Sequence, residues 1–132
     1  MSDVNVLVVF YSRYGDTEKL ATAAGVGAIQ ARANLRLRRL KDLAGPDAIA
    51  RDPAWTAALE RLNMDYIAPR EIDAQWADVI VVACPADARA ELAQYIKSIE
   101  ATVRKPIVTL SDAASALATG KRAAEDARHL KA

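Results

Sequence analysis

The sequence predicts a doubly wound α/β fold with a mostly parallel sheet, in a single domain that spans residues 1–132. Residues 6–11 and 79–83 are continuous apolar runs rich in β-branched residues, which is typical of strands buried on both faces of a parallel sheet. Helical patterns follow both runs, and right-handed crossovers join strands that alternate with helices in this way. A length of 132 residues also falls within the size range of one domain.

The first strand, residues 6–11, should lie at the centre of the sheet because it is apolar throughout. Turn-forming residues 12–18 follow it, and an alanine-rich helix with one apolar face is expected over residues 17–31. Gly25 and Gly27 each cost such a helix up to ~1 kcal/mol relative to alanine. We therefore expect them where this helix packs closely against the sheet.

Residues 35–38 alternate Leu-Arg-Leu-Arg, which is typical of a strand with one covered and one solvated face. The pattern places this second strand at an edge of the sheet, with its arginines pointing outward. Residues 41–77 show a weaker pattern that proline and glycine interrupt. We interpret them as a connection that contains one short helix over residues 54–62.

The third strand, residues 79–83, leads into a helix whose apolar stripe runs from Leu92 to Val103. Residues 107–110 form the fourth strand, and a last helix that Gly120 could interrupt follows. These elements give the strand order 2-1-3-4, in which the direction of winding reverses between strands 1 and 3. Ligands of such folds bind at that point, where the loops 12–17 and 84–89 open.

Composition and charge exclude several classes of function. Eighteen basic and 17 acidic residues nearly cancel, so the chain lacks the strong positive field of a general nucleic-acid binder. Its apolar runs are far shorter than the ~20 residues that cross a bilayer, and its first residues lack the basic region of a signal peptide. The single cysteine, Cys84, allows no internal disulfide and no cysteine-zinc cluster. We expect a cytoplasmic protein without membrane or nucleic-acid partners.

The first loop carries the strongest chemical signal. Ser12, Gly15 and Thr17 lie between a buried strand and the start of a helix, so that hydroxyl groups and unpaired backbone N–H groups face one point. That point is the positive end of the helix dipole, and it attracts phosphate.

Residues 11–18, Tyr-Ser-Arg-Tyr-Gly-Asp-Thr-Glu, resemble the flavodoxin-like family, nearest the tryptophan-repressor-binding-protein type of NAD(P)H:quinone oxidoreductase. The resemblance implies that this loop holds the phosphate of FMN, with Arg13 as an electrostatic helper, and that NAD(P)H is a co-substrate. It requires no catalytic side chain, because the flavin performs the chemistry. No metal site is predicted, because His129 has no second ligand at metal spacing. The predicted cofactor-binding residues are Ser12, Arg13, Tyr14, Gly15, Asp16, Thr17 and Pro85.

The chain departs from that family in its other loops. In the second loop, Ala-Cys-Pro-Ala-Asp-Ala-Arg at residues 83–89, only Pro85 matches the family pattern. No contacts to the flavin ring can therefore be assigned to residues 86–88. Residues 111–116 replace a glycine-rich third loop, and the helical composition that follows leaves no candidate for a fifth strand.

Each candidate also has a structural interpretation. Asp16 could cap the first helix itself, occupying the N–H groups and repelling a phosphate, in which case the loop is an ordinary turn. Cys84 is expected to be a buried, unreactive thiol, and His129 to be solvated. Trp55 and Trp76 are interpreted as packing residues that cover the sheet. The basic cluster is interpreted as a solvated edge strand; it comprises Arg32, Arg36, Arg38, Arg39 and Lys41.

Two functions remain open. The first is an FMN-binding redox protein that passes hydride from NAD(P)H to a quinone-like acceptor, with a flavin nucleotide or another phosphate-bearing small molecule as its partner. The second is a degenerate domain without flavin that acts as a binding or dimerisation module. Loss of a fifth strand would expose the fourth strand as a sheet edge and favour a homodimer.

Overall fold

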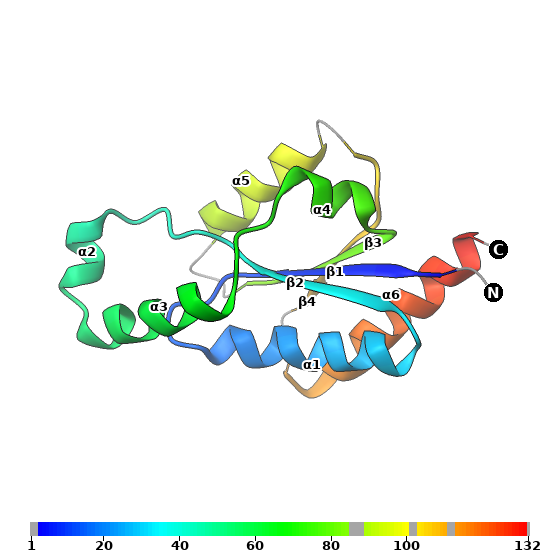
Figure 1. Ribbon diagram of the computed structural model, residues 1–132, viewed down its shortest axis with the longest axis horizontal. Coiled ribbons are helices and arrows are strands. Elements are labelled where there is room, and N and C mark those ends of the chain that lie inside the picture. The colour runs from blue at the N-terminus through cyan, green and yellow to red at the C-terminus, as the bar shows by residue number, and fades with distance from the viewer. Residues whose placement is uncertain (1–2, 85–88, 101–102, 111–112, 132) are drawn as a thin grey trace.

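The computed structural model describes residues 3–84, 89–100, 103–110 and 113–131, and it contains a four-stranded parallel sheet between two layers of helices (Figure 1). The strand order is β2-β1-β3-β4, as the sequence predicts. The strands are β1 (Asn5–Phe10), β2 (Asn34–Arg39), β3 (Val79–Ala83) and β4 (Ile107–Leu110).

The central position of β1 explains its uninterrupted apolar run. Val6 pairs with Leu35 of β2 on one side and with Val79 of β3 on the other. All residues of β1 after Asn5 are buried, and so is every residue of β3. Both strands are covered on both faces, which is why their sequences show no alternation of polar and apolar residues.

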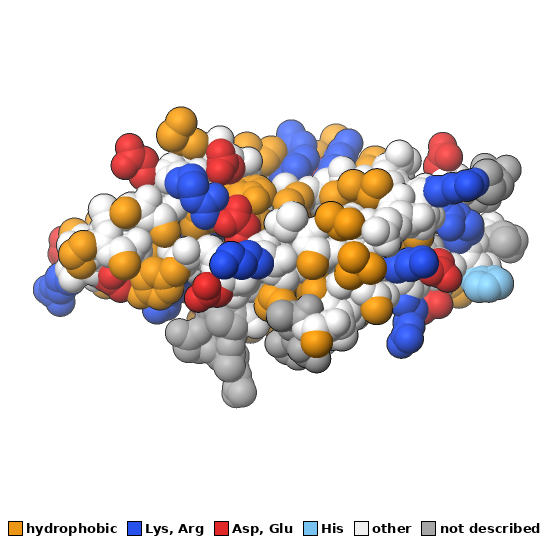
Figure 2. All heavy atoms as spheres, turned by 90° about the horizontal axis from the view of Figure 1, so that it is seen from below, with side chains coloured by type: hydrophobic (Ala, Val, Ile, Leu, Met, Phe, Trp, Pro, Cys, Tyr) orange, Lys and Arg blue, Asp and Glu red, His pale blue; other side chains and the backbone are white. Residues whose placement is uncertain are grey.

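Helices cover both faces of the sheet (Figure 1). The even-numbered positions of β1 face α1 (Asp16–Gln30) and α6 (Ala116–Lys131). A short 3-10 helix, η2 (Ala113–Ser115), comes directly before α6. The odd-numbered positions face α4 (Glu71–Trp76) and α5 (Arg89–Glu100). Figure 2 shows the α1 and α6 face from below, where basic and acidic side chains are scattered and neither sign forms a continuous patch.

Glycines allow α1 and α6 to approach each other at backbone distance. A Cβ atom built on Gly27 would lie 2.0 Å from the carbonyl oxygen of Leu117, and one on Gly120 would lie 1.8 Å from that of Ala24. Gly27 therefore faces another helix rather than the sheet, which corrects the expectation for this residue, whereas Gly25 does face Leu35 of β2. The predicted interruption at Gly120 is wrong, because α6 runs through it and buries it.

The connection between β2 and β3 is more helical than the sequence suggests. It contains α2 (Pro46–Ala50), α3 (Pro53–Asp65) and α4, of which only the central part of α3 was expected. The α2 and α3 helices extend past the carboxyl end of the strands, on the left of Figure 1. They therefore stand beside the loop that follows β1.

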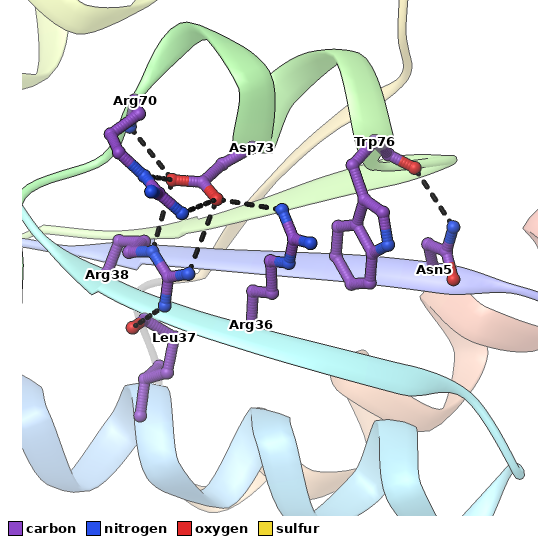
Figure 3. A network of polar contacts seen from close by, with 7 residues as sticks. All are labelled: Asn5, Arg36, Leu37, Arg38, Arg70, Asp73 and Trp76. Atoms are coloured by element: carbon purple, nitrogen blue, oxygen red, sulfur yellow. Dashed lines mark hydrogen bonds and ion pairs between the residues drawn. The ribbon is translucent and has the colours of Figure 1, made fainter.

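The arginines of β2 are not simply solvated. Leu35 and Leu37 pack towards α1, whereas Arg36 and Arg38, which alternate with them, face α4, where the carboxylate of Asp73 is completely buried (Figure 3). Arg36 Nη1 and Arg38 Nε each lie 3.1 Å from a carboxylate oxygen of Asp73. The predicted alternation of faces is confirmed, but the outward orientation of the arginines is wrong, because α4 supplies an anion that holds them.

Candidate functional site

The loop after β1 is built around one hydrogen bond. The amide of Gly15 donates to Ser12 Oγ over 2.8 Å, and both residues are buried. Gly15 has a φ of 107°, a left-handed conformation that glycine adopts without the steric penalty of a side chain. This turn directs the chain from the end of β1 into α1.

The start of α1 leaves backbone donors available. Gly15 is the N-cap of α1 and no side chain caps the helix. Within the described ranges, the amides of Asp16, Thr17 and Glu18 have no hydrogen-bond acceptor. Such groups carry the positive end of the helix dipole. The interpretation of Asp16 as the N-cap is wrong: Asp16 is the first helical residue, and its side chain is exposed.

Arg39 supports this loop from the carboxyl end of β2. Its Nε and Nη2 donate to the carbonyl oxygen of Ser12 over 3.2 and 2.8 Å, and Nη2 also lies 3.2 Å from Asp42 Oδ2. Asp42 in turn accepts a 2.6 Å hydrogen bond from the Tyr11 hydroxyl. Burial, and then this hydrogen bond, raise the pKa of Tyr11. Arg39 is 4% exposed, so its assignment to a solvated edge was wrong.

Arg13 points towards α3. Its guanidinium lies 4.3 Å from the ring centroid of Trp55, and its Nε donates to the Tyr11 hydroxyl over 3.2 Å. Trp55 is buried, which agrees with its interpretation as a packing residue, although it covers the loop rather than the sheet. The half-buried Trp76 packs against the core on the α4 and α5 face of the sheet, as predicted, and the Arg36 guanidinium lies 4.2 Å from its ring centroid. An electrostatic role of Arg13 towards a ligand stays a prediction.

Tyr14 ties the loop to the start of α3. Its hydroxyl donates to Asp52 Oδ2 over 2.5 Å, and Asp52 caps α3 by accepting from the amide of Trp55 over 3.1 Å. The hydrogen bond from Tyr14 lowers the pKa of Asp52. Thr17, the remaining hydroxyl residue of the motif, is buried in the first turn of α1.

A second link between α1 and α3 was not predicted. Arg61 of α3 donates to both carboxylate oxygens of Glu18, over 2.7 and 3.1 Å, and the Tyr66 hydroxyl donates to Glu18 over 2.5 Å. The hydrogen bond from Arg61 lowers the pKa of Glu18, whereas burial, and then the bond to Glu18, raise that of Tyr66 to about 12. Glu18 and Arg61 are 43 positions apart, and no local spacing indicates their contact.

The remaining candidates add little to this site. Cys84 is half-buried at the end of β3, while Pro85, with residues 86–88 and 111–112, lies outside the described residues. His129 is exposed, as expected.

The described part of the chain contains no cluster of three or more histidine, cysteine, aspartate or glutamate residues that could hold a metal ion. None of its helices is long and apolar enough to cross a membrane.

Part of the sequence is similar to two curated proteins, each named NAD(P)H dehydrogenase (quinone). The protein from Brucella anthropi is 36% identical over 75 residues, which cover 57% of this chain and 34% of that protein. The protein from Deinococcus radiodurans is 32% identical over 82 residues, or 62% of this chain and 40% of that protein. The match thus spans two fifths or less of either relative. No family model matches the chain.

Solved structures show the same architecture at low sequence identity. An archaeal flavodoxin superposes with a TM-score of 0.53 at 14% identity, covering 96% of this chain and all of the flavodoxin. A flavone reductase superposes with a TM-score of 0.52 at 10% identity, covering 97% of this chain and 64% of that structure. Together with the strand order, these similarities confirm the resemblance predicted from residues 11–18, and the fold of the chain is flavodoxin-like.

Proposed function

We propose that this chain is a flavodoxin-like redox protein that binds FMN through the loop after β1 and passes electrons from NAD(P)H to a quinone-like acceptor. The observation that carries the proposal is the set of open amides at Asp16, Thr17 and Glu18, in the loop whose sequence resembles a flavin-phosphate loop. The names of the two curated relatives support the reaction class. We place the protein in the cytoplasm, because a single cysteine gives no sign of an oxidising compartment.

The residues present fit a phosphate group. Ser12 and Arg39 hold the loop from two sides, which fixes the position of the amides in the first turn of α1. A phosphate dianion accepts hydrogen bonds from such amides and interacts favourably with the helix dipole. When bound, the flavin supplies the redox chemistry, and the protein binds and orients it.

The visible absorption spectrum tests the proposal. We expect the purified protein to carry a flavin, or to take up added FMN and show the visible bands of the bound oxidised cofactor. The double variant Ser12→Ala/Thr17→Ala is expected to lose FMN, because it removes the acceptor that fixes Gly15 and a buried side chain of the first turn. A wild-type protein that stays colourless and takes up no FMN would contradict the proposed function.

Asp16→Asn should tighten FMN binding several-fold. The exposed Asp16 carboxylate lies in the first turn of α1, beside the open amides, and repels a phosphate dianion. Fluorescence titration with FMN at low salt measures the change, which added salt should reduce. Asp47→Asn serves as the control, since Asp47 is an exposed first-turn residue of a different helix, α2. Unchanged or weaker binding by Asp16→Asn would show that the phosphate lies elsewhere.

The free edge of β4 favours a second role as a dimerisation module. On the side away from β3, β4 pairs with no strand of the described ranges. Its residues Ile107 and Val108 are only half-buried, and open apolar edges invite pairing with another chain. We therefore also propose a homodimer. Light scattering over a range of protein concentrations tests it, and a monomer at every concentration would overturn it.

A further inference from the structure

Arg61 lies at the opening of the candidate phosphate site, although it belongs to α3 and not to the loop. Its Nη2 is 3.3 Å from the position that a Cβ atom would take on Gly15. Gly15 is the N-cap of α1, so this guanidinium stands beside the open end of the helix. The absence of a side chain on Gly15 leaves the space that Arg61 needs for this approach.

Arg61 keeps unused hydrogen-bonding capacity in this position. A guanidinium has five N–H groups. Acceptors within the described part of the chain engage three of them: Nη2 donates once and Nη1 once to Glu18, and Nη1 donates once to Asp65. The second N–H of Nη2, on the atom nearest Gly15, and the Nε–H have no acceptor among the described residues. The Arg61 side chain is 48% exposed, so solvent and ligands can reach it.

The Glu18 carboxylate fixes Arg61 without enclosing it. Glu18 is 15% exposed and accepts from both Arg61 and Tyr66, so the pair is held at one place on the first turn of α1. Tyr66 is itself anchored by an edge-to-face contact with Phe10 of β1, with 5.0 Å between ring centroids. Arg61 is thus a pre-positioned cation beside three open amides.

We propose that Arg61 binds the phosphate group of the ligand together with the first turn of α1, using the free N–H of Nη2 while its bonds to Glu18 remain. The proposal rests on the proposed function for the identity of the ligand as a phosphate monoester. It adds a positive charge from the β2–β3 connection to the open backbone amides of the site. Arg61 would then distinguish FMN from riboflavin, which has no phosphate.

Isothermal titration of the full chain with FMN, riboflavin and inorganic phosphate tests this role. We expect Arg61→Gln to weaken FMN binding about five- to tenfold, the scale of one charge-assisted hydrogen bond at a half-exposed site, and to leave riboflavin binding unchanged. Arg61→Lys keeps the positive charge and should therefore lose less FMN affinity than Arg61→Gln. Arg51→Gln is the matched control, because Arg51 is an exposed arginine at the end of α2.

The Tyr66→Phe variant distinguishes the effect of the Arg61 charge from a purely structural effect on the position of α3. This variant removes the other hydrogen bond to Glu18 but leaves the Arg61 charge. If Arg61→Gln acted only by loosening α3, Tyr66→Phe would weaken FMN binding to a similar extent, and the proposal would be wrong. Equal FMN affinity of Arg61→Gln and Arg51→Gln would also overturn it, while leaving the flavin function intact. If the protein bound inorganic phosphate through Arg61 but did not bind FMN, the phosphate-binding role of Arg61 would be supported and the redox function refuted. A wild-type protein that binds neither phosphate nor FMN would refute both proposals.

Discussion

Replacing Asp73 with asparagine is expected to lower the free energy of unfolding by about 3 kcal/mol, because it leaves a cluster of arginines without their anion. Asp73 is completely buried and accepts from Arg36, from Arg38 and from both the backbone and the side chain of Arg70 (Figure 3). Asparagine has one acceptor oxygen in place of two, and its amide donors face other donors. The arginines are partly exposed, which keeps the loss below that of a fully buried charge.

The same cluster predicts how stability depends on pH. Burial alone would raise the pKa of Asp73, but hydrogen bonds from the Arg70 backbone and side chain, and from Arg38, outweigh it and hold the pKa at about 2. The folded protein therefore binds this proton less readily than the unfolded chain, whose pKa is about 4. The stabilisation is present above pH 4 and is lost as the pH falls through 2, by about 2 kcal/mol. Asp73→Asn should lack this part of the acid dependence.

Urea unfolding at neutral pH and at pH 3 measures both effects. Asp65→Asn is the control, since Asp65 forms an exposed ion pair with Arg61 and should change stability by less than about 0.5 kcal/mol. If Asp73→Asn were as stable as Asp65→Asn, or kept the full acid dependence of the wild type, the cluster would not stabilise the fold.

The strands were predictable because the burial of each strand face determines a hydrophobic pattern in the local sequence. Both β1 and β3 are covered on two faces and are apolar throughout, and the alternation in β2 follows its two different faces. The connection between β2 and β3 has a weaker hydrophobic pattern. Its helices α2 and α4 have five and six residues, too short to form without tertiary contacts. Contacts between Asp73 and the β2 arginines hold α4 in place, and no local pattern encodes those pairs.

In the candidate site, too, the features encoded by neighbouring residues were predictable and the contacts between distant segments were not. Its loop was predictable, because a buried strand, a serine, a glycine and a threonine precede an alanine-rich helix within a few residues. The error at Asp16 has a local cause: the left-handed turn at Gly15 starts the helix one residue earlier, so Asp16 becomes helical and cannot cap. Arg39 and Arg61 reach the loop from distant segments, and only the fold brings them there.

Gly120→Ala is expected to destabilise the protein by about 3 kcal/mol or more, at the upper end of the cost of overpacking. The added Cβ would lie 1.8 Å from the carbonyl oxygen of Ala24, and a backbone atom inside a helix cannot move aside as a flexible side chain can. The α1 and α6 helices would have to separate along their crossing. The gain in helix propensity from alanine, up to ~1 kcal/mol, offsets only part of this loss.

Thermal and urea unfolding of Gly120→Ala and Gly45→Ala provide the comparison. Gly45 has no atom within 4 Å of its Cβ position and a φ of −71°, so alanine should be tolerated or slightly stabilising there. Gly27→Ala meets the Leu117 backbone at 2.0 Å and should resemble Gly120→Ala. The double variant at 27 and 120 should cost less than the sum, because helices already separated by one methyl group admit the second more easily. A Gly120→Ala protein as stable as Gly45→Ala would mean that the helices do not cross at backbone contact.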